Sequence, residues 1–331
     1  MDAMDEPAHG EKDLYPPIQK LMEGREYAVV PQFETFSPLT RRRRKLDLLG
    51  FRWIGDGDLD AWGIEGKQGE SPADTLLALG QAIEYQLYVP RVSVAAGVPP
   101  EYLAYAESPL RQLGLGYIHA TTTLATEIIA PAISPRCYQN EFNQVIRHAG
   151  VLCLLGRERW KEQDSHQEHH SGGAKTAGEA GYPSYTIHNK DPVQYSLSAN
   201  GQSKKVRITI WIDRKPAWKH IYPQIEPGRL AELLGNLDAT TNLSIFKRDN
   251  FGSLGSCLER QQLLHDQAAI AKGLDYARER LKEDRVIPVI SVALELWAWD
   301  AMPRRAEAEN AVEQAIERLE PIRTYLAAMA K

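Results

Sequence analysis

The first half of the chain alternates hydrophobic and polar positions with periods that predict short strands and amphipathic helices. Turn-forming residues separate these segments, and GDGD at residues 55–58 is typical of a hairpin. The predicted elements are a helix at 13–22, strands at 26–33, 45–54 and 61–68, a helix at 72–89, a strand at 91–97, a helix at 101–113 and a strand at 113–120. Three neighbouring strands followed by crossover helices predict a mixed sheet covered on both faces.

The helix at 72–89 carries leucine and isoleucine at helical spacing, which predicts one buried stripe. The stripe consists of Leu76, Leu79, Ile83 and Leu87.

A polar, glycine-rich segment at 161–185 has no apolar periodicity and is typical of a flexible linker. It divides the chain into an acidic tail at 1–12, a first domain at 13–160 and a second α+β domain at 186–331. In the second domain the pattern predicts strands at 193–199, 205–212 and 286–296 and helices at 228–236 and 255–283. A final amphipathic helix has six apolar residues on one face, which we interpret as core packing, with a homodimer contact as the alternative. The six are Ala308, Val312, Ala315, Leu319, Ile322 and Leu326.

Composition narrows the class of protein. The 331 residues are 43% apolar and 25% charged, as in ordinary globular proteins, and no apolar run approaches the ~20 residues that cross a bilayer. The acidic start lacks the pattern of a secretory signal, and three widely spaced cysteines suggest no disulfide or zinc framework. We therefore expect a cytoplasmic protein without membrane contact. Its net charge of −5 requires any polyanion to bind at local basic patches.

Candidate chemistry lies on the strands at 45–54 and 61–68. Strand alternation sets Glu65 and Lys67 on one face with the small residues Ala61 and Gly63. The hairpin brings Asp47 beside Glu65, inside an apolar run where an unpaired carboxylate is costly. Two adjacent carboxylates repel unless they share a proton or a cation, and Mg²⁺ prefers such ligands together with water and phosphate. A nearby lysine can orient the attacking water and stabilise charge at phosphorus.

These residues resemble the PD-(D/E)xK, or restriction-endonuclease-like, nuclease superfamily. Asp47 matches its first acid, Glu65 its second acid and Lys67 its lysine, although Leu46 replaces the proline often found before the first acid. Gln81-Ala-Ile-Glu-Tyr85 is similar to the Gln-Ala-x-x-Tyr motif of RecB-type nucleases. The order of the elements over residues 11–125 is similar as well.

The resemblance implies an α/β fold with a restriction-endonuclease-like mixed sheet flanked by helices, and a nuclease that uses Mg²⁺ or Mn²⁺. Asp47, Glu65 and the Gly66 carbonyl would bind the metal, with Glu23 as a further ligand. Lys67 would position water and Gln81 would support it.

The expected partner is nucleic acid, and DNA rather than RNA. The residues expected to contact it are Arg41, Arg42, Arg43, Arg44 and Tyr85. Defence, repair and mobile-element processing all fit such an enzyme.

Other interpretations stay open at this point. The fold can serve as a non-catalytic nucleic-acid-binding or regulatory module, or as an RNA-directed phosphodiesterase. Rival acids are Asp56, Asp58 and Asp60 for the first position and Glu34 for the helix position. His166, His169 and His170 offer zinc ligands, although a polar linker is the simpler interpretation, and His119 fits a core position.

Overall fold

The computed structural model describes residues 10–37, 43–67, 72–97, 100–134, 137, 141–160, 166–171, 184–189, 191–212, 215–237, 242–248, 254–259, 287–330 and scattered residues between 267 and 278. The chain forms two compact units. The first comprises Met1–Leu154, His169–Tyr185 and Ala199–Lys204, and the second comprises Leu155–Glu168, Thr186–Ser198 and Lys205–Lys331. The chain therefore passes between the units several times, in place of a single crossing through a linker.

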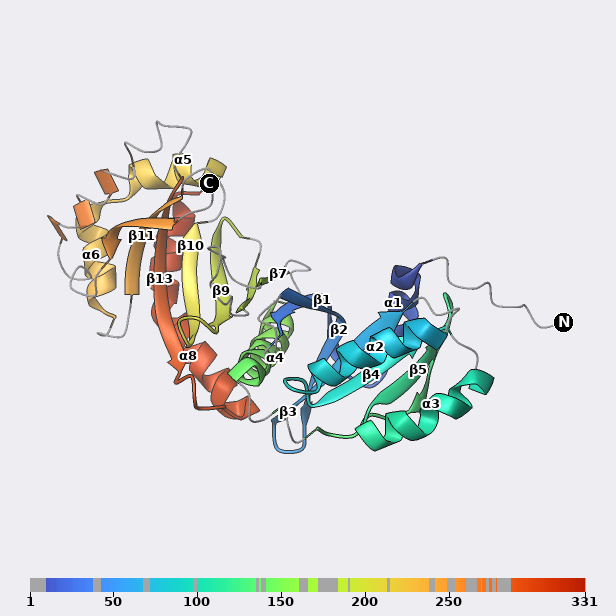
Figure 1. Cartoon of the computed structure of the whole chain (residues 1–331). Coiled ribbons are helices and arrows are strands. Elements are labelled where there is room, and N and C mark those ends of the chain that lie inside the picture. The colour runs from blue at the N-terminus through green and yellow to red at the C-terminus, as the bar shows by residue number, and fades with distance from the viewer. Residues whose placement is uncertain are drawn as a thin grey trace. The chain divides into compact units, whose positions relative to one another are not determined.

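A six-stranded mixed sheet in the order β1-β2-β3-β4-β5-β6 forms the first unit (Figure 1). The strands are β1 (Ala28–Phe36), β2 (Arg43–Ile54), β3 (Asp58–Lys67), β4 (Arg91–Ala96), β5 (Gly116–Ala120) and β6 (Ala125–Ile129). The pairs β3–β4 and β4–β5 are parallel, and the other neighbours are antiparallel. The predicted mixed α/β class is confirmed.

Helices cover both faces of this sheet, as predicted. They are η1 (Glu11–Leu14), α1 (Tyr15–Glu23), α2 (Pro72–Tyr85), α3 (Pro100–Leu113) and α4 (Glu141–Arg159). On one face α1 buries Ile18 and Met22 against Leu48, Trp62 and Ile64. Each such side chain stabilises the fold by roughly 2 kcal/mol when fully buried. On the other face α2 contacts β3 and β4.

The predicted buried stripe of α2 is wrong in part. Ala78, Ala82 and Tyr85 are fully buried, whereas Ile83 is 39% exposed. Small residues at helical spacing let α2 approach β3 and β4 closely, and the larger aliphatic side chains are left toward its edges. Leu79 and Leu87 are half-buried, and the side chain of Leu76 lies outside the described residues.

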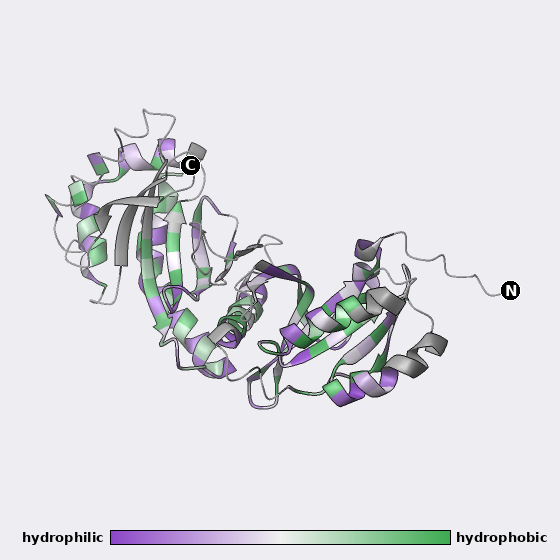
Figure 2. Cartoon of the chain, viewed as in Figure 1, coloured by the Kyte–Doolittle hydropathy of each residue, from purple (hydrophilic) through white to green (hydrophobic). Residues whose placement is uncertain are grey.

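A seven-stranded sheet in the order β12-β11-β13-β10-β9-β8-β7 lies mainly in the second unit, although parts of β7, β8 and β9 are assigned to the first. Its strands are β7 (His166–Ser171), β8 (Ser184–Asn189), β9 (Val193–Asn200), β10 (Lys205–Ile212), β11 (Asn242–Arg248), β12 (Leu254–Glu259) and β13 (Ile287–Trp297), and its helices include α5 (Lys215–Gln224), α6 (Pro227–Gly235) and α8 (Arg305–Ala328). The apolar face of α8 contacts β13 and β10, and all six predicted apolar positions are buried. Apolar residues run along the central strands, and the helices carry both apolar and polar residues (Figure 2).

Several sequence-based boundaries differ from the structure. Leu254–Glu259, predicted as the start of a helix at 255–283, is strand β12, because it pairs antiparallel with β11. Within the predicted linker at 161–185, residues 166–171 form β7. Within the predicted acidic tail at 1–12, η1 already begins at Glu11, and residues 1–9 lie outside the described residues.

Candidate functional site

The candidate site lies where β2 and β3 separate. Backbone pairing between these strands begins beside the hairpin turn, where Ile54 pairs with Asp58. It ends where Leu48 pairs with Ile64. Beyond this point β2 stays paired with β1, as far as the pair of Arg43 with Phe36. Strand β3 stays paired with β4, as far as the pair of Lys67 with Ala96. We call this divergence the β2–β3 fork. Asp47, Glu65 and Lys67 all lie at the fork, so the hairpin brings together the three residues chosen from the sequence.

Asp47 is the most constrained of these side chains. Its Oδ1 accepts hydrogen bonds from the Tyr15 hydroxyl at 2.7 Å and from Gln32 Nε2 at 3.1 Å. Its Oδ2 accepts the Gly66 N–H at 2.7 Å. With 6% of its surface exposed, Asp47 is held by groups from α1, β1 and β3. These bonds fix the direction of the carboxylate.

Gln32 holds Asp47 from a strained position in the backbone. Its φ is +55°, in the left-handed region that residues with a side chain seldom adopt. The pairing of β1 with β2 skips this residue: Pro31 pairs with Leu48, and the next pair is Phe33 with Leu46. Strain of this kind costs about 1–3 kcal/mol and persists where the surroundings compensate for it. Here the compensation includes the bond from the Gln32 amide to Asp47.

Glu65 and Lys67 form an ion pair in which half of the carboxylate is unsatisfied. Lys67 Nζ donates to Glu65 Oε1 at 2.6 Å, with Lys67 21% and Glu65 2% exposed. Glu65 Oε2 is buried and has no hydrogen-bond partner among the described residues. A buried carboxylate oxygen without a donor or a cation costs free energy, so this atom marks a place where a positive ligand would be stabilising.

The pKa of Glu65 reflects this environment. Burial, and after it the nearby Asp47 charge, raise the pKa of Glu65 from its ordinary 4.5 to about 7, although Lys67 and Tyr85 act in the opposite direction. Tyr85 stands beside this carboxylate, and burial raises its own pKa so that the hydroxyl keeps its proton. That hydroxyl donates to the Lys45 carbonyl at 3.1 Å and also lies close enough to the Glu65 carboxylate to lower its pKa, but its single hydrogen can serve only one of the two acceptors at a time.

The helix carrying Gln81 and Tyr85 borders the same site. Tyr85 is buried near Glu65, and Gln81 is partly exposed on the same helix. Between them, Glu84 Oε2 forms an ion pair with Arg44 Nε at 3.2 Å. The other oxygen of Glu84 is buried without a hydrogen-bond partner among the described residues. Arg44, predicted to bind nucleic acid, is thus tied to α2. Arg41 and Arg42 lie outside the described residues, as does the side chain of Arg43.

Other sequence candidates lie away from the fork. Glu23 is exposed, accepts a hydrogen bond from Gln19 at 2.7 Å and stands eight residues, or ~12 Å, along α1 from Tyr15. Asp60 is buried but is bound by Tyr27, Arg52 and Arg91, and Asp56 and Asp58 are exposed at the hairpin turn. None of these acids joins Asp47 and Glu65.

Two residues of the site were missed by sequence reasoning, namely Tyr15 and Gln32. Gly66, whose carbonyl is predicted to bind a metal, donates its N–H to Asp47. Within the described residues no group of three or more His, Cys, Asp or Glu side chains is arranged to hold a metal. A pair of carboxylates still suits Mg²⁺, which commonly takes one or two from the protein and completes its shell with water and phosphate.

No family model, curated protein or solved structure is significantly similar to the chain. Among the described helices, none is long and apolar enough to cross a bilayer.

Proposed function

We propose that the chain is a metal-dependent nuclease with a restriction-endonuclease-like first unit, acting on DNA phosphodiester bonds. The observation that carries the proposal is the buried, unpartnered Oε2 of Glu65 beside the Asp47 carboxylate. A divalent cation would satisfy that oxygen and remove the repulsion between the two charges. The first-domain motif and the mixed sheet are consistent with this assignment.

In this proposal each side chain has a defined role. Asp47 and Glu65 would hold Mg²⁺ or Mn²⁺, which supplies Lewis-acid stabilisation of the phosphate when bound. Lys67, which now donates to Glu65 Oε1, would orient the attacking water and stabilise charge on the phosphate oxygens. Tyr15 and Gln32 keep Asp47 in one rotamer, since both donate to its Oδ1. Gln81 would support Lys67 from α2.

A cleavage assay tests the proposal. Plasmid, linear and single-stranded DNA and RNA are incubated with the full chain and Mg²⁺ or Mn²⁺, beside Lys67→Ala, Asp47→Asn and the control Arg111→Gln, which alters an exposed ion pair on α3. We expect the wild type and the control to cleave DNA, and both site variants to lose at least about a hundredfold in rate. Cleavage that both site variants retain would refute the assignment.

One observation favours a non-catalytic module instead. Asp47 receives three hydrogen bonds from three different elements, which is also how a purely structural carboxylate is held. Binding of Mn²⁺, measured by electron paramagnetic resonance without substrate, separates the two. Saturable binding that Glu65→Gln abolishes supports the nuclease, and absence of both binding and cleavage supports the module.

A further inference from the structure

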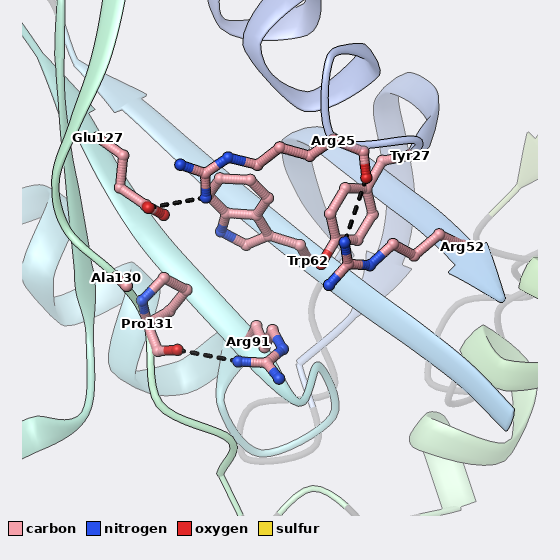
Figure 3. A pocket seen from close by; sticks show the side chains of 8 residues that line it. All are labelled: Arg25, Tyr27, Arg52, Trp62, Arg91, Glu127, Ala130 and Pro131. Carbon is pink, nitrogen blue, oxygen red and sulfur yellow. Dashed lines mark hydrogen bonds and ion pairs between the residues drawn. The ribbon is translucent and has the colours of Figure 1, made fainter. Parts of the chain in front are cut away.

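A polar cavity lies in the first unit, and Asp47, Glu65 and Lys67 are not among the residues that line it. Its volume is about 160 Å³, and Arg25, Tyr27, Arg52, Trp62, Arg91, Glu127, Ala130 and Pro131 line it (Figure 3). Trp62 precedes Lys67 by five residues on β3, so it lies ~17 Å along the strand from that lysine. At roughly 30 Å³ per water, it holds about five water molecules. A single phosphate group fits within this volume with water molecules beside it.

The charge of the cavity is positive. The three guanidinium groups of Arg25, Arg52 and Arg91 face two carboxylates. Arg25 pairs with Glu127 at 2.7 Å, while Arg52 and Arg91 share Asp60 at 3.2 and 3.0 Å. One positive charge is therefore left over, because arginine stays protonated at all ordinary pH values.

The cavity is also rich in hydrogen-bond donors. Three arginines supply fifteen N–H groups. Their ion pairs and hydrogen bonds to Glu127, Asp60, the Arg25 carbonyl and the Pro131 carbonyl use five of these among the described residues. The Nε of Arg52 is buried with no acceptor among them, and the second carboxylate oxygen of Glu127 is buried with no donor among them. Such an excess of donors matches a ligand that carries only acceptors.

The guanidinium groups are held in place before any ligand binds. Arg25 lies over the Trp62 ring at 5.5 Å and Arg52 over the Tyr27 ring at 4.4 Å (Figure 3). Burial raises the pKa of Tyr27, so its hydroxyl keeps the proton that it donates to Asp60 at 2.7 Å. Asp60 in turn fixes Arg52 and Arg91. Preorganised arginines lose little side-chain entropy on binding an oxyanion.

We propose that this cavity is a binding site for a phosphate group. The guanidinium groups of Arg25, Arg52 and Arg91 donate to the phosphate oxygens, and the Trp62 ring supports Arg25 from below. Trp62 is 2% exposed and gives its N–H to Ser93 at 2.9 Å, so it supports an arginine and does not offer its ring to a ligand. Phosphate binding here is independent of the metal site proposed above.

Calorimetric titration of the full chain with inorganic phosphate at constant ionic strength tests this site. We expect saturable binding that Arg25→Gln weakens about tenfold, since one charge-assisted contact is lost. Glu127→Gln should tighten binding severalfold, because it removes negative charge from the cavity. Arg111→Gln, an equal change of charge elsewhere in the unit, should leave the affinity unchanged.

The opposite effects of Arg25→Gln and Glu127→Gln keep the test decisive even if Arg25→Gln unfolds, since Glu127→Gln retains every donor. No saturable binding, or equal affinity for wild type and Glu127→Gln, would overturn the proposal. Competition by a 5′-phosphorylated oligonucleotide, but not by its 5′-hydroxyl form, would identify the phosphate as a nucleic-acid end. Failure of both to compete would identify it as free phosphate.

Discussion

Replacing Glu65 with glutamine should make the first unit more stable at neutral and alkaline pH. The carboxyl of Glu65 has a pKa of about 7 in the folded chain, against 4.5 as its ordinary value. The folded state therefore binds more protons than the unfolded state between these values. The contribution of Glu65 is fully present below pH 4.5 and is lost as pH rises through 7.

The size of this effect follows from the two pKa values. A difference of about 2.5 units corresponds to about 3 kcal/mol of unfolding free energy lost between low pH and pH 8. Exposure does not diminish it, because Glu65 is 2% exposed. Glutamine resembles the protonated acid at every pH, so Glu65→Gln should be about 3 kcal/mol more stable than wild type at pH 8 and equal to it at pH 4.5.

Urea denaturation from pH 4.5 to 8.5 measures the difference, with the transition of the first unit assigned by hydrogen exchange of the β3 amides. Glu107→Gln is the control, since Glu107 is exposed in an ion pair on α3. Added Mg²⁺ should stabilise the wild type at pH 8 and leave Glu65→Gln unchanged, because only the ionised carboxylate binds it. Parallel pH profiles for wild type and Glu65→Gln would show that our account of this buried carboxylate is wrong.

Two further predictions concern side chains that support the sheet. At Gln32 the positive φ should make Gln32→Gly more stable than Gln32→Ala by about 1 kcal/mol. Thermal unfolding of both variants tests this, and an alanine variant as stable as the glycine variant would show that the backbone at this position is not strained. Asp60→Asn should lower the free energy of unfolding by about 3 kcal/mol, because Arg52 and Arg91 lose a shared buried partner. A decrease below about 1 kcal/mol in urea denaturation would mean that solvent replaces Asp60 readily.

The sequence was most informative where contacts are local. The β2–β3 hairpin has a short turn, so alternation and turn chemistry were enough to bring Asp47 beside Glu65. Tyr15 and Gln32 were missed because one contacts Asp47 across 32 residues and the other through an irregular strand, neither of which leaves a periodic signal. Strand β11 was missed for a related reason, since it pairs with β13 far along the chain, whereas β12 was missed although it pairs locally with β11.

The division of the chain between the units affects how the protein can be made. Tyr185 belongs to the first unit and stacks on Phe33, with ring centroids 6.4 Å apart. During synthesis, the last residues of the first unit are therefore added only after parts of the second unit have been made. A fragment ending at residue 160 would leave Phe33 without this aromatic partner. The first unit is complete only once Lys204 has been added, so no single C-terminal truncation yields it free of segments of the second unit.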